Sequence, residues 1–288
     1  MSRVVKVGLI GCGVMGARHA SVVAACSEAH LACVVDIVPA KARAVAERTG
    51  AATTWCDDVD VAIVATPTAS HVDVAAPLLE RGLWVLVEKP VASSEAEARV
   101  LDHPRCLVGH CERFNPAVRA GAIRRPTRLE VHREGPWTGR SADIDVLADV
   151  MVHDLDLLLG WAGPSHDLSC VSARGWRGPS GRIDRAEVEL AGGGLQARLV
   201  ADRMGQARRR TVAGQDARGS LSLDLVAGHA ARDGRSVAPV DDRDALQAQW
   251  AAVRARVAAR ESAVAGVGEA RRALRLASII RERIQQSP

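Results

Sequence analysis

The sequence predicts an α/β protein in which a doubly wound parallel sheet is followed by an α+β domain with a largely antiparallel open sheet. Two observations carry this prediction. Short β-branched runs alternate with amphipathic stretches over the first 118 residues, as in consecutive βαβ units. After Gly121 polar and apolar residues alternate one by one, which is typical of strands with one solvated face. We therefore predict two domains, residues 1–118 and residues 119–288.

The first domain is expected to contain buried parallel strands joined by helices, because its apolar runs are too hydrophobic for half-exposed strands. The expected strands are residues 4–10, 31–35, 61–65, 84–87 and 106–109, and the expected helices are residues 14–26, 40–48, 70–81 and 94–101. The crossover lengths fit a doubly wound sheet.

The second domain is expected to combine antiparallel strands with a few helices. The three glycines at 192–194 predict a hairpin turn between two of the strands. We expect strands at 128–134, 168–176, 187–190 and 195–201, one helix at 147–159, and two helices at 245–259 and 269–285.

Length and composition indicate a globular chain of two domains. It has 288 residues, of which 48% are hydrophobic and 25% are charged. No run approaches the roughly 18 apolar residues of a membrane span, and the amino terminus enters a strand without a secretory apolar segment. We therefore expect a cytoplasmic protein without membrane contact. Seven cysteines, an odd number without a C-x-x-C pair, argue against a disulfide framework or a structural zinc site, and are expected to be buried, reduced thiols.

The charge pattern does not favour nucleic-acid binding. The net charge is +4, and the only basic triplet, residues 208–210, lacks interleaved aromatic residues. We interpret it as a solvated cluster at a strand edge. Only Lys6, Lys41 and Lys89 are lysines, so a lysine within a motif is informative. The chain has no tyrosine, which excludes any mechanism that depends on a catalytic tyrosine.

A glycine motif directly after the first expected strand predicts a dinucleotide site. The run Gly11-Cys12-Gly13-Val14-Met15-Gly16 is a G-x-G-x-x-G that opens a helix, whose amino terminus favours a pyrophosphate. Asp36 follows 20 residues after the last glycine, where a carboxylate holds the adenosine ribose. Strand, glycines, helix and acid together predict a Rossmann domain with cofactor contacts from Gly11, Gly13, Val14, Met15, Gly16 and Asp36.

The residues around Asp36 favour NAD over NADP. A carboxylate repels a 2′-phosphate, and the next residue, Ile37, cannot anchor one. Lys41 and Arg43 keep NADP as an alternative.

A polar run after the third expected strand lies where cofactors bind to such sheets. Thr66, Pro67, Thr68 and His71 follow the strand at its carboxyl end and are expected to contact the cofactor. The alternative is a helix start in which Thr68 or Ser70 serves as the N-cap and His71 covers the first turn.

Two further groups carry the expected chemistry. Glu88-Lys89-Pro90 ends the fourth strand, so Lys89 should face the cofactor crevice and donate to a substrate hydroxyl. Asp149 and His153 are spaced by one helical turn and should point together into a cleft between the domains, with Asp156 on the same side. Metal ligation is a minor alternative, because no third ligand is suitably spaced.

In these motifs, and in their order and spacing, the chain resembles the glucose–fructose oxidoreductase, inositol dehydrogenase and MocA family. The resemblance implies that Lys89 and His153 are the catalytic pair and that Asp149 helps to hold the substrate and the histidine. It also implies that Glu88 and Lys89 contact the cofactor. The second domain would supply the substrate site and, through its sheet, the contacts of a homodimer or homotetramer.

The strings at 109–116 and 149–156 resemble the branch of UDP-N-acetylglucosamine 3-dehydrogenases. On this reading Lys89, Arg113, Asn115, Asp149 and His153 contact a nucleotide sugar, with Arg113 on the diphosphate. Arg113 is alternatively a structural residue paired with Glu112 or another carboxylate. The alternatives for the whole chain are a dehydrogenase of a free sugar or polyol, a nonenzymatic sensor of NAD or sugar, and a reductase of another carbonyl or imine.

Overall fold

The computed structural model describes residues 3–139, 141–163 and 166–286. The chain forms two compact units, Met1–Cys111 with Ala245–Arg271, and Glu112–Asp244 with Arg272–Pro288. The first break thus falls after Cys111, a few residues before the boundary predicted at residue 118, and residues 245–271 return to the first unit. There α7 (Ala245–Val257) packs against α1 (Val14–Ala24), and strand β14 (Ala265–Gly266) joins the sheet.

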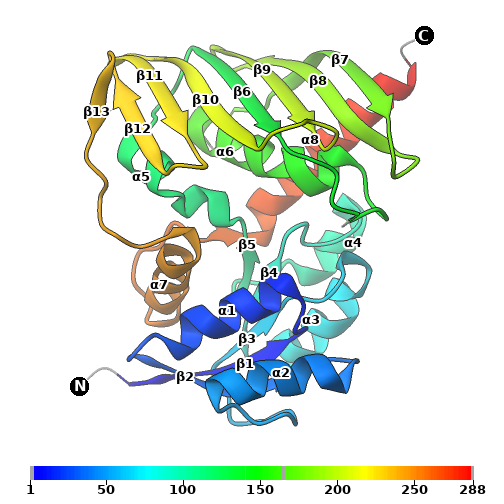
Figure 1. The fold of residues 1–288 in the computed structure, drawn as a ribbon, viewed down its shortest axis with the longest axis vertical. Helices are drawn as coiled ribbons and strands as arrows, with labels where there is room; N and C mark the ends of the chain where they lie inside the picture. Colours follow the sequence, from blue (N-terminus) through cyan, green and yellow to red (C-terminus); the bar gives the residue numbers. More distant parts are fainter. Residues whose placement is uncertain (1–2, 140, 164–165, 287–288) are drawn as a thin grey trace. The chain divides into compact units, whose positions relative to one another are not determined.

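The first unit is a doubly wound parallel sheet, as predicted (Figure 1). The strand order is β14-β5-β4-β3-β1-β2, and every neighbouring pair is parallel except β14 with β5. All residues of β3 and β5 are buried, which explains why these strands are continuous apolar runs. The other elements are β1 (Val5–Ile10), β2 (Ala29–Val35), β3 (Val61–Val64), β4 (Trp84–Glu88), β5 (Cys106–Gly109), α2 (Pro39–Thr49), η1 (Thr68–Ser70), α3 (His71–Glu80), α4 (Glu95–Ala98) and η2 (Arg99–Leu101).

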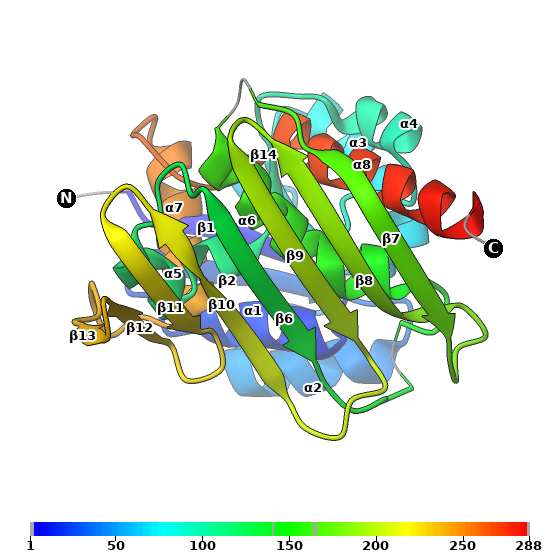
Figure 2. The ribbon, with the colours of Figure 1, turned by 90° about the horizontal axis from the view of Figure 1, so that it is seen from above.

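The second unit contains an eight-stranded sheet of order β13-β12-β11-β10-β6-β9-β8-β7 (Figure 2). Only β6 and β9 are parallel neighbours, so the prediction of a largely antiparallel sheet is confirmed. Its strands are β6 (Arg128–Glu134), β7 (Ser169–Arg177), β8 (Ile183–Gly192), β9 (Leu195–Asp202), β10 (Arg209–Asp216), β11 (Gly219–Asp224), β12 (His229–Arg232) and β13 (Arg235–Val237).

The hairpin predicted at the three glycines is confirmed, since β8 and β9 are antiparallel and Gly192 pairs with Leu195. Gly193 and Gly194 have φ of 58° and 84°, a region that glycine enters without a steric cost. Strands β10 to β13 were not predicted.

Helices cover one face of this sheet (Figure 1). They are η3 (Cys111–Phe114), α5 (Pro116–Gly121), the π-turn η4 (Leu147–Met151), α6 (Val152–Ala162) and most of α8 (Val267–Gln286). Leu147, Leu155 and Leu158 are fully buried in the core between the helices and the strands. The other face carries charged rows, in which Arg198 lies between Glu130 and Glu189 on the neighbouring strands.

All seven cysteines are free thiols. Cys12, Cys33 and Cys106 are buried as predicted, whereas the prediction is wrong for the partly exposed Cys26, Cys56, Cys111 and Cys170. In the described part of the chain, no helix has the length and apolar character needed to cross a membrane.

Candidate active site

The glycine loop between β1 and α1 has the shape of a phosphate cradle. Gly11 has φ of 93°, and a Cβ on it would lie 2.6 Å from the Ala65 carbonyl group. A Cβ on Gly16 would lie 1.8 Å from Gly11 O, so this glycine lets the helix pack against the loop. A Cβ on Gly13 would meet no protein atom within 4 Å. The open direction above Gly13 is therefore available to a ligand, and each glycine of the motif has a separate steric reason.

The amino terminus of α1 is suited to an anion. Its N-cap residue is Gly13, so no side chain caps the helix. The first turn, with Val14 and Met15, contains no acidic residue. The N–H groups of a first turn have no partner within the helix. Burial, with a contribution from the charge of Asp36, raises the pKa of the Cys12 thiol to about 11, so this thiol is neutral at pH 7 and does not repel a phosphate.

Asp36, directly after β2, organises the glycine loop. Its Oδ2 accepts a hydrogen bond from the Cys12 N–H at 2.7 Å, and its Oδ1 accepts one from the Val38 N–H at 2.8 Å. A carboxylate has about four lone-pair sites, so both oxygens can also accept bonds from ribose hydroxyls. The glycine loop, the uncapped helix and Asp36 thus fit the pyrophosphate and adenosine ribose of NAD.

The polar run after β3 is held by its own contacts. The hydroxyl oxygen of Ser70 lies 2.9 Å from Thr66 Oγ1 and 2.8 Å from the Pro67 carbonyl oxygen, within hydrogen-bond distance of both. Ser70 is the N-cap residue of α3, as the alternative stated, although its side chain makes no cap bond, and Thr68 is not an N-cap. His71 is 1% exposed, and its Nδ1 and Nε2 lie 2.9 Å from the carbonyl oxygens of Pro90 and Thr66. Its side chain thus links this run to the segment after β4.

The carboxyl end of β4 carries Glu88 and Lys89. The Glu88 side chain is buried, its Oε1 lies 2.7 Å from His19 Nε2 on α1, and its Oε2 accepts a bond from the Lys89 N–H. Burial acts to raise the pKa of Glu88, but the hydrogen bond and charge of His19 outweigh it, and the pKa is lowered. Glu88 therefore ties the end of β4 to the helix of the glycine loop. Lys89 is partly buried and precedes Pro90 through a cis peptide bond.

The helix expected over residues 147–159 begins as a π-turn. Residues 147–151 form η4, and regular α-helix starts only at Val152. The Val152 N–H accordingly bonds to Leu147 O, one residue further back than in an α-helix. Asp149 thus lies in the π-turn and His153 in the first turn of α6. Single π-turns in helices are frequent at functional sites.

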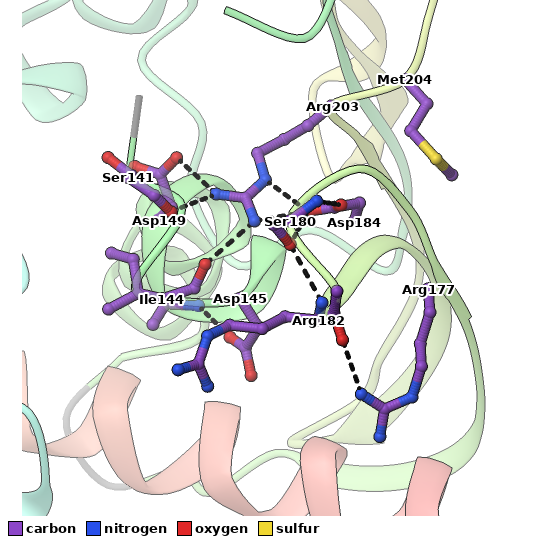
Figure 3. Close-up of polar contacts among 12 residues, drawn as sticks. Ser141, Ile144, Asp145, Asp149, Arg177, Ser180, Arg182, Asp184, Arg203 and Met204 are labelled. Carbon is purple, nitrogen blue, oxygen red and sulfur yellow. Dashed lines mark hydrogen bonds and ion pairs between the residues drawn. The ribbon is translucent and has the colours of Figure 1, made fainter. Parts of the chain in front are cut away.

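Asp149 and Asp156 have different surroundings. Asp149 is 20% exposed and accepts a bond from Arg203 Nη1 at 3.2 Å (Figure 3). Asp156 is 2% exposed and binds Arg113 through two bonds of 2.7 Å each. Of the two interpretations of Arg113, these contacts match the pairing with a nearby carboxylate.

A cluster of buried charged side chains ties α6 to the sheet of the second unit through Asp154. Arg133 of β6 donates to Asp154 and, at 3.0 Å, to Glu112. Arg210 of β10 also donates to Glu112 at 3.0 Å. Although burial acts against the charge of Arg133, the two carboxylates raise its pKa, so it stays cationic. The expectation that the triplet at 208–210 is a solvated cluster at a strand edge is wrong for Arg210, because β10 lies between two strands and this side chain points to Glu112.

Asn115 has a role within the second unit. Its amide nitrogen donates to Glu112 and to the Leu225 carbonyl, and its oxygen caps α5 by accepting the Ala117 N–H. Both N–H groups of the Asn115 amide are therefore used within the protein, so a bond donated by this amide to a substrate would require one of them to be exchanged.

The predicted residues fall into two groups. Gly11, Gly13, Gly16 and Asp36 come together at the carboxyl edge of the first sheet, and the segments after β3 and β4 lie at the ends of adjacent strands. Asp149 and His153 belong to the second unit. The sequence reasoning missed Arg203, Arg133 and Asp184, since nothing local distinguishes them in a chain so rich in arginine. A search for arginines at strand ends opposite the D-x-x-x-H helix could have found two of them.

Comparisons with known proteins agree with this geometry. Residues 5–103 match the family model described as an oxidoreductase family with an NAD-binding Rossmann fold. The UDP-N-acetylglucosamine 3-dehydrogenase of Acidithiobacillus ferrooxidans is 32% identical over 239 residues, which cover 76% of this chain and 74% of that protein. A solved structure of a UDP-N-acetylglucosamine 3-dehydrogenase from that organism has a TM-score of 0.87 at 28% identity, with 99% of each chain covered.

An inositol 2-dehydrogenase of Corynebacterium glutamicum is 32% identical over 187 residues, 57% of this chain and 56% of that protein. The family model and these relatives make the chain an oxidoreductase, with NAD as the favoured cofactor. The chain belongs to the glucose–fructose oxidoreductase, inositol dehydrogenase and MocA family.

Proposed function

We propose that this oxidoreductase oxidises a sugar hydroxyl to a ketone, and that its substrate is a UDP-N-acetylhexosamine that reacts at C3. The observation that carries the proposal is the order of two motifs along the chain. Lys89 follows β4, and Asp149 and His153 form a D-x-x-x-H motif that spans η4 and the first turn of α6. The substrate class is supported by a relative named UDP-N-acetylglucosamine 3-dehydrogenase, which is similar over 76% of the length of this chain.

In this proposal His153 and Lys89 act on the same hydroxyl oxygen. His153 accepts the hydroxyl proton on an imidazole nitrogen as the general base. The Lys89 ammonium group donates a hydrogen bond to the oxygen and stabilises the charge that develops on it. NAD⁺, when bound, supplies the acceptor for the hydride that leaves the substrate carbon. Asp149 holds the substrate and orients the histidine, and the reverse reduction uses the same groups.

Arg113, the proposed contact of the diphosphate, is not a solvated side chain. That guanidinium group already binds Asp156, and its side chain is 16% exposed. We propose that Arg113 contacts the diphosphate while it stays paired with Asp156, so that this ion pair orients its guanidinium group. The sheet of the second unit remains the proposed surface of a homo-oligomer.

The second candidate is a dehydrogenase of a free polyol, which the similarity to an inositol 2-dehydrogenase favours. The experiment is a comparison of kcat/KM for UDP-N-acetylglucosamine, N-acetylglucosamine and myo-inositol with NAD⁺, followed by nicotinamide absorbance. We expect the nucleotide sugar to be preferred, because binding energy from the remote nucleotide orients the reacting hydroxyl. Equal values, or a preference for myo-inositol, would reject the nucleotide-sugar assignment and leave the oxidoreductase assignment intact.

A further inference from the structure

Arg203 lies directly after β9, and all five of its N–H groups are engaged (Figure 3). Nε and Nη2 donate to Asp184 Oδ1 at 3.1 and 2.5 Å. Nη2 also donates to the Ile144 carbonyl at 2.9 Å, and Nη1 donates to the Ser141 carbonyl at 2.9 Å and to Asp149 Oδ2 at 3.2 Å. A guanidinium group has five N–H donors, so one buried side chain joins three segments with no donor left over.

Asp184 is the fixed anchor of this arginine. Its side chain is fully buried, and it also accepts bonds from the Ser180 N–H at 2.8 Å and the Ser180 hydroxyl at 2.7 Å. Burial acts to raise the pKa of Asp184, but the bonds from Ser180 and Arg203 outweigh it, so the pKa is lowered and the group stays ionised. Asp184 therefore neutralises Arg203 and sets its orientation from the side of β8.

The other acceptors of Arg203 belong to the segment that carries Asp149. Ser141 and Ile144 lead into the π-turn, and Asp149 lies within it, one turn before His153. The ring of Trp137 also lies 5.1 Å from the Arg203 guanidinium group. A displacement of Arg203 would therefore move the entry segment and the Asp149 carboxylate together.

One guanidinium group faces two carboxylates, and Asp149 is the more exposed of the two, 20% against none for Asp184. The buried Asp184 already neutralises the charge of Arg203. The bond to Asp149 is a second, more exposed contact of the same guanidinium group. A carboxylate close to an imidazole favours the protonated form of the ring, which is the form that a general base takes up during the reaction.

We propose that Arg203 is a positioning residue of the dehydrogenase reaction, which acts by holding the Asp149 carboxylate and the π-turn in the orientation that His153 requires. Arg203 does not itself contact the substrate. The inference rests on the proposed function, because that function gives Asp149 and His153 their roles. Arg281 provides the matched control, since it binds Asp145 at the same helix entry and its bonds go to that carboxylate.

The test is a double-mutant cycle of Arg203→Lys and Asp149→Asn, measured with whichever substrate of the panel is oxidised fastest. A wrong nucleotide-sugar assignment therefore does not affect it. We expect Arg203→Lys to lower kcat about tenfold in the wild-type background and less than about threefold in the Asp149→Asn background. The KM for NAD⁺ should change little. Arg281→Lys should have the same effect on kcat in both backgrounds.

An equal loss of kcat from Arg203→Lys in the two backgrounds would overturn the proposal. If Arg203→Lys does not fold, Asp184→Asn keeps the arginine and loosens its anchor, and the same coupling to Asp149→Asn is expected. If no member of the panel is oxidised, the proposed function fails, and hydrogen–deuterium exchange over residues 141–149 still tests the inference. Exchange unchanged by Arg203→Lys would show that Arg203 does not hold this segment.

Discussion

Alanine substitutions at Gly13 and Gly16 should separate cofactor binding from folding within one motif. A Cβ on Gly16 would overlap Gly11 O at 1.8 Å, whereas a Cβ on Gly13 meets no protein atom within 4 Å. Close overlap with backbone cannot be relieved by a side-chain movement, so Gly16→Ala should cost at least about 3 kcal/mol of unfolding free energy. Gly13 has φ of −69°, which alanine adopts, so Gly13→Ala should change stability by no more than about 1 kcal/mol.

The methyl group of Gly13→Ala would instead occupy the space where the pyrophosphate approaches the loop. We expect NADH affinity to fall by about tenfold to a hundredfold, which corresponds to about 1.4 to 2.8 kcal/mol. The assays are urea unfolding for stability and calorimetric titration for NADH. Gly268→Ala is the control, since its Cβ is equally unobstructed but it lies on α8, away from the loop. Wild-type NADH affinity in Gly13→Ala would refute the assignment of this loop to the cofactor.

Three further predictions follow from the two units. Asp36→Ala should weaken NAD⁺ binding and reduce the preference over NADP⁺, because it removes both the ribose acceptor and the charge that repels a 2′-phosphate; an unchanged ratio of the two affinities would exclude Asp36 as the ribose anchor. Lys89→Ala and His153→Ala should each lower kcat by about a hundredfold or more and leave NADH affinity nearly unchanged; wild-type turnover in either variant would remove that residue from the mechanism. The pKa of Glu88 is lowered in the folded state, so its stabilisation is present above the ordinary carboxyl value of 4.5 and is lost as the pH falls through the lowered value. Glu88→Gln should therefore destabilise by about 2 kcal/mol at pH 7 and progressively less below pH 4.5, and a difference that does not depend on pH would contradict this.

The parts of the fold that were predicted are those with local signals. The strands β1 to β5 and the helices α1 to α3 of the first unit were found because each is a continuous apolar or amphipathic run. Strand β14 was not found, because two residues, Ala265 and Gly266, have no pattern of their own and become a strand only by pairing with β5. The same long-range pairing carries residues 245–271 into the first unit.

The candidate site was predictable where spacing alone defines it. The glycine motif follows β1, and Asp36 follows β2, which is joined to the motif by one helix and pairs with β1, so their spacing along the sequence fixes their proximity. The partners of the aspartates near α6 were not predictable, because Asp149 pairs with a residue 54 positions away and Asp156 with one 43 positions away. The spacing rule also failed at residues 147–151, since a π-turn changes the register that an i, i+4 pattern assumes.

The central claim is that this chain removes a hydride from C3 of a nucleotide sugar. The most direct measurement uses UDP-N-acetylglucosamine that carries deuterium at C3, incubated with NAD⁺ and the protein, with the reduced cofactor analysed by mass spectrometry. We expect one deuterium on the nicotinamide ring and a 3-keto nucleotide sugar as the product. Reduced cofactor without deuterium would show that another carbon is oxidised, and the absence of reduced cofactor would contradict the proposed substrate.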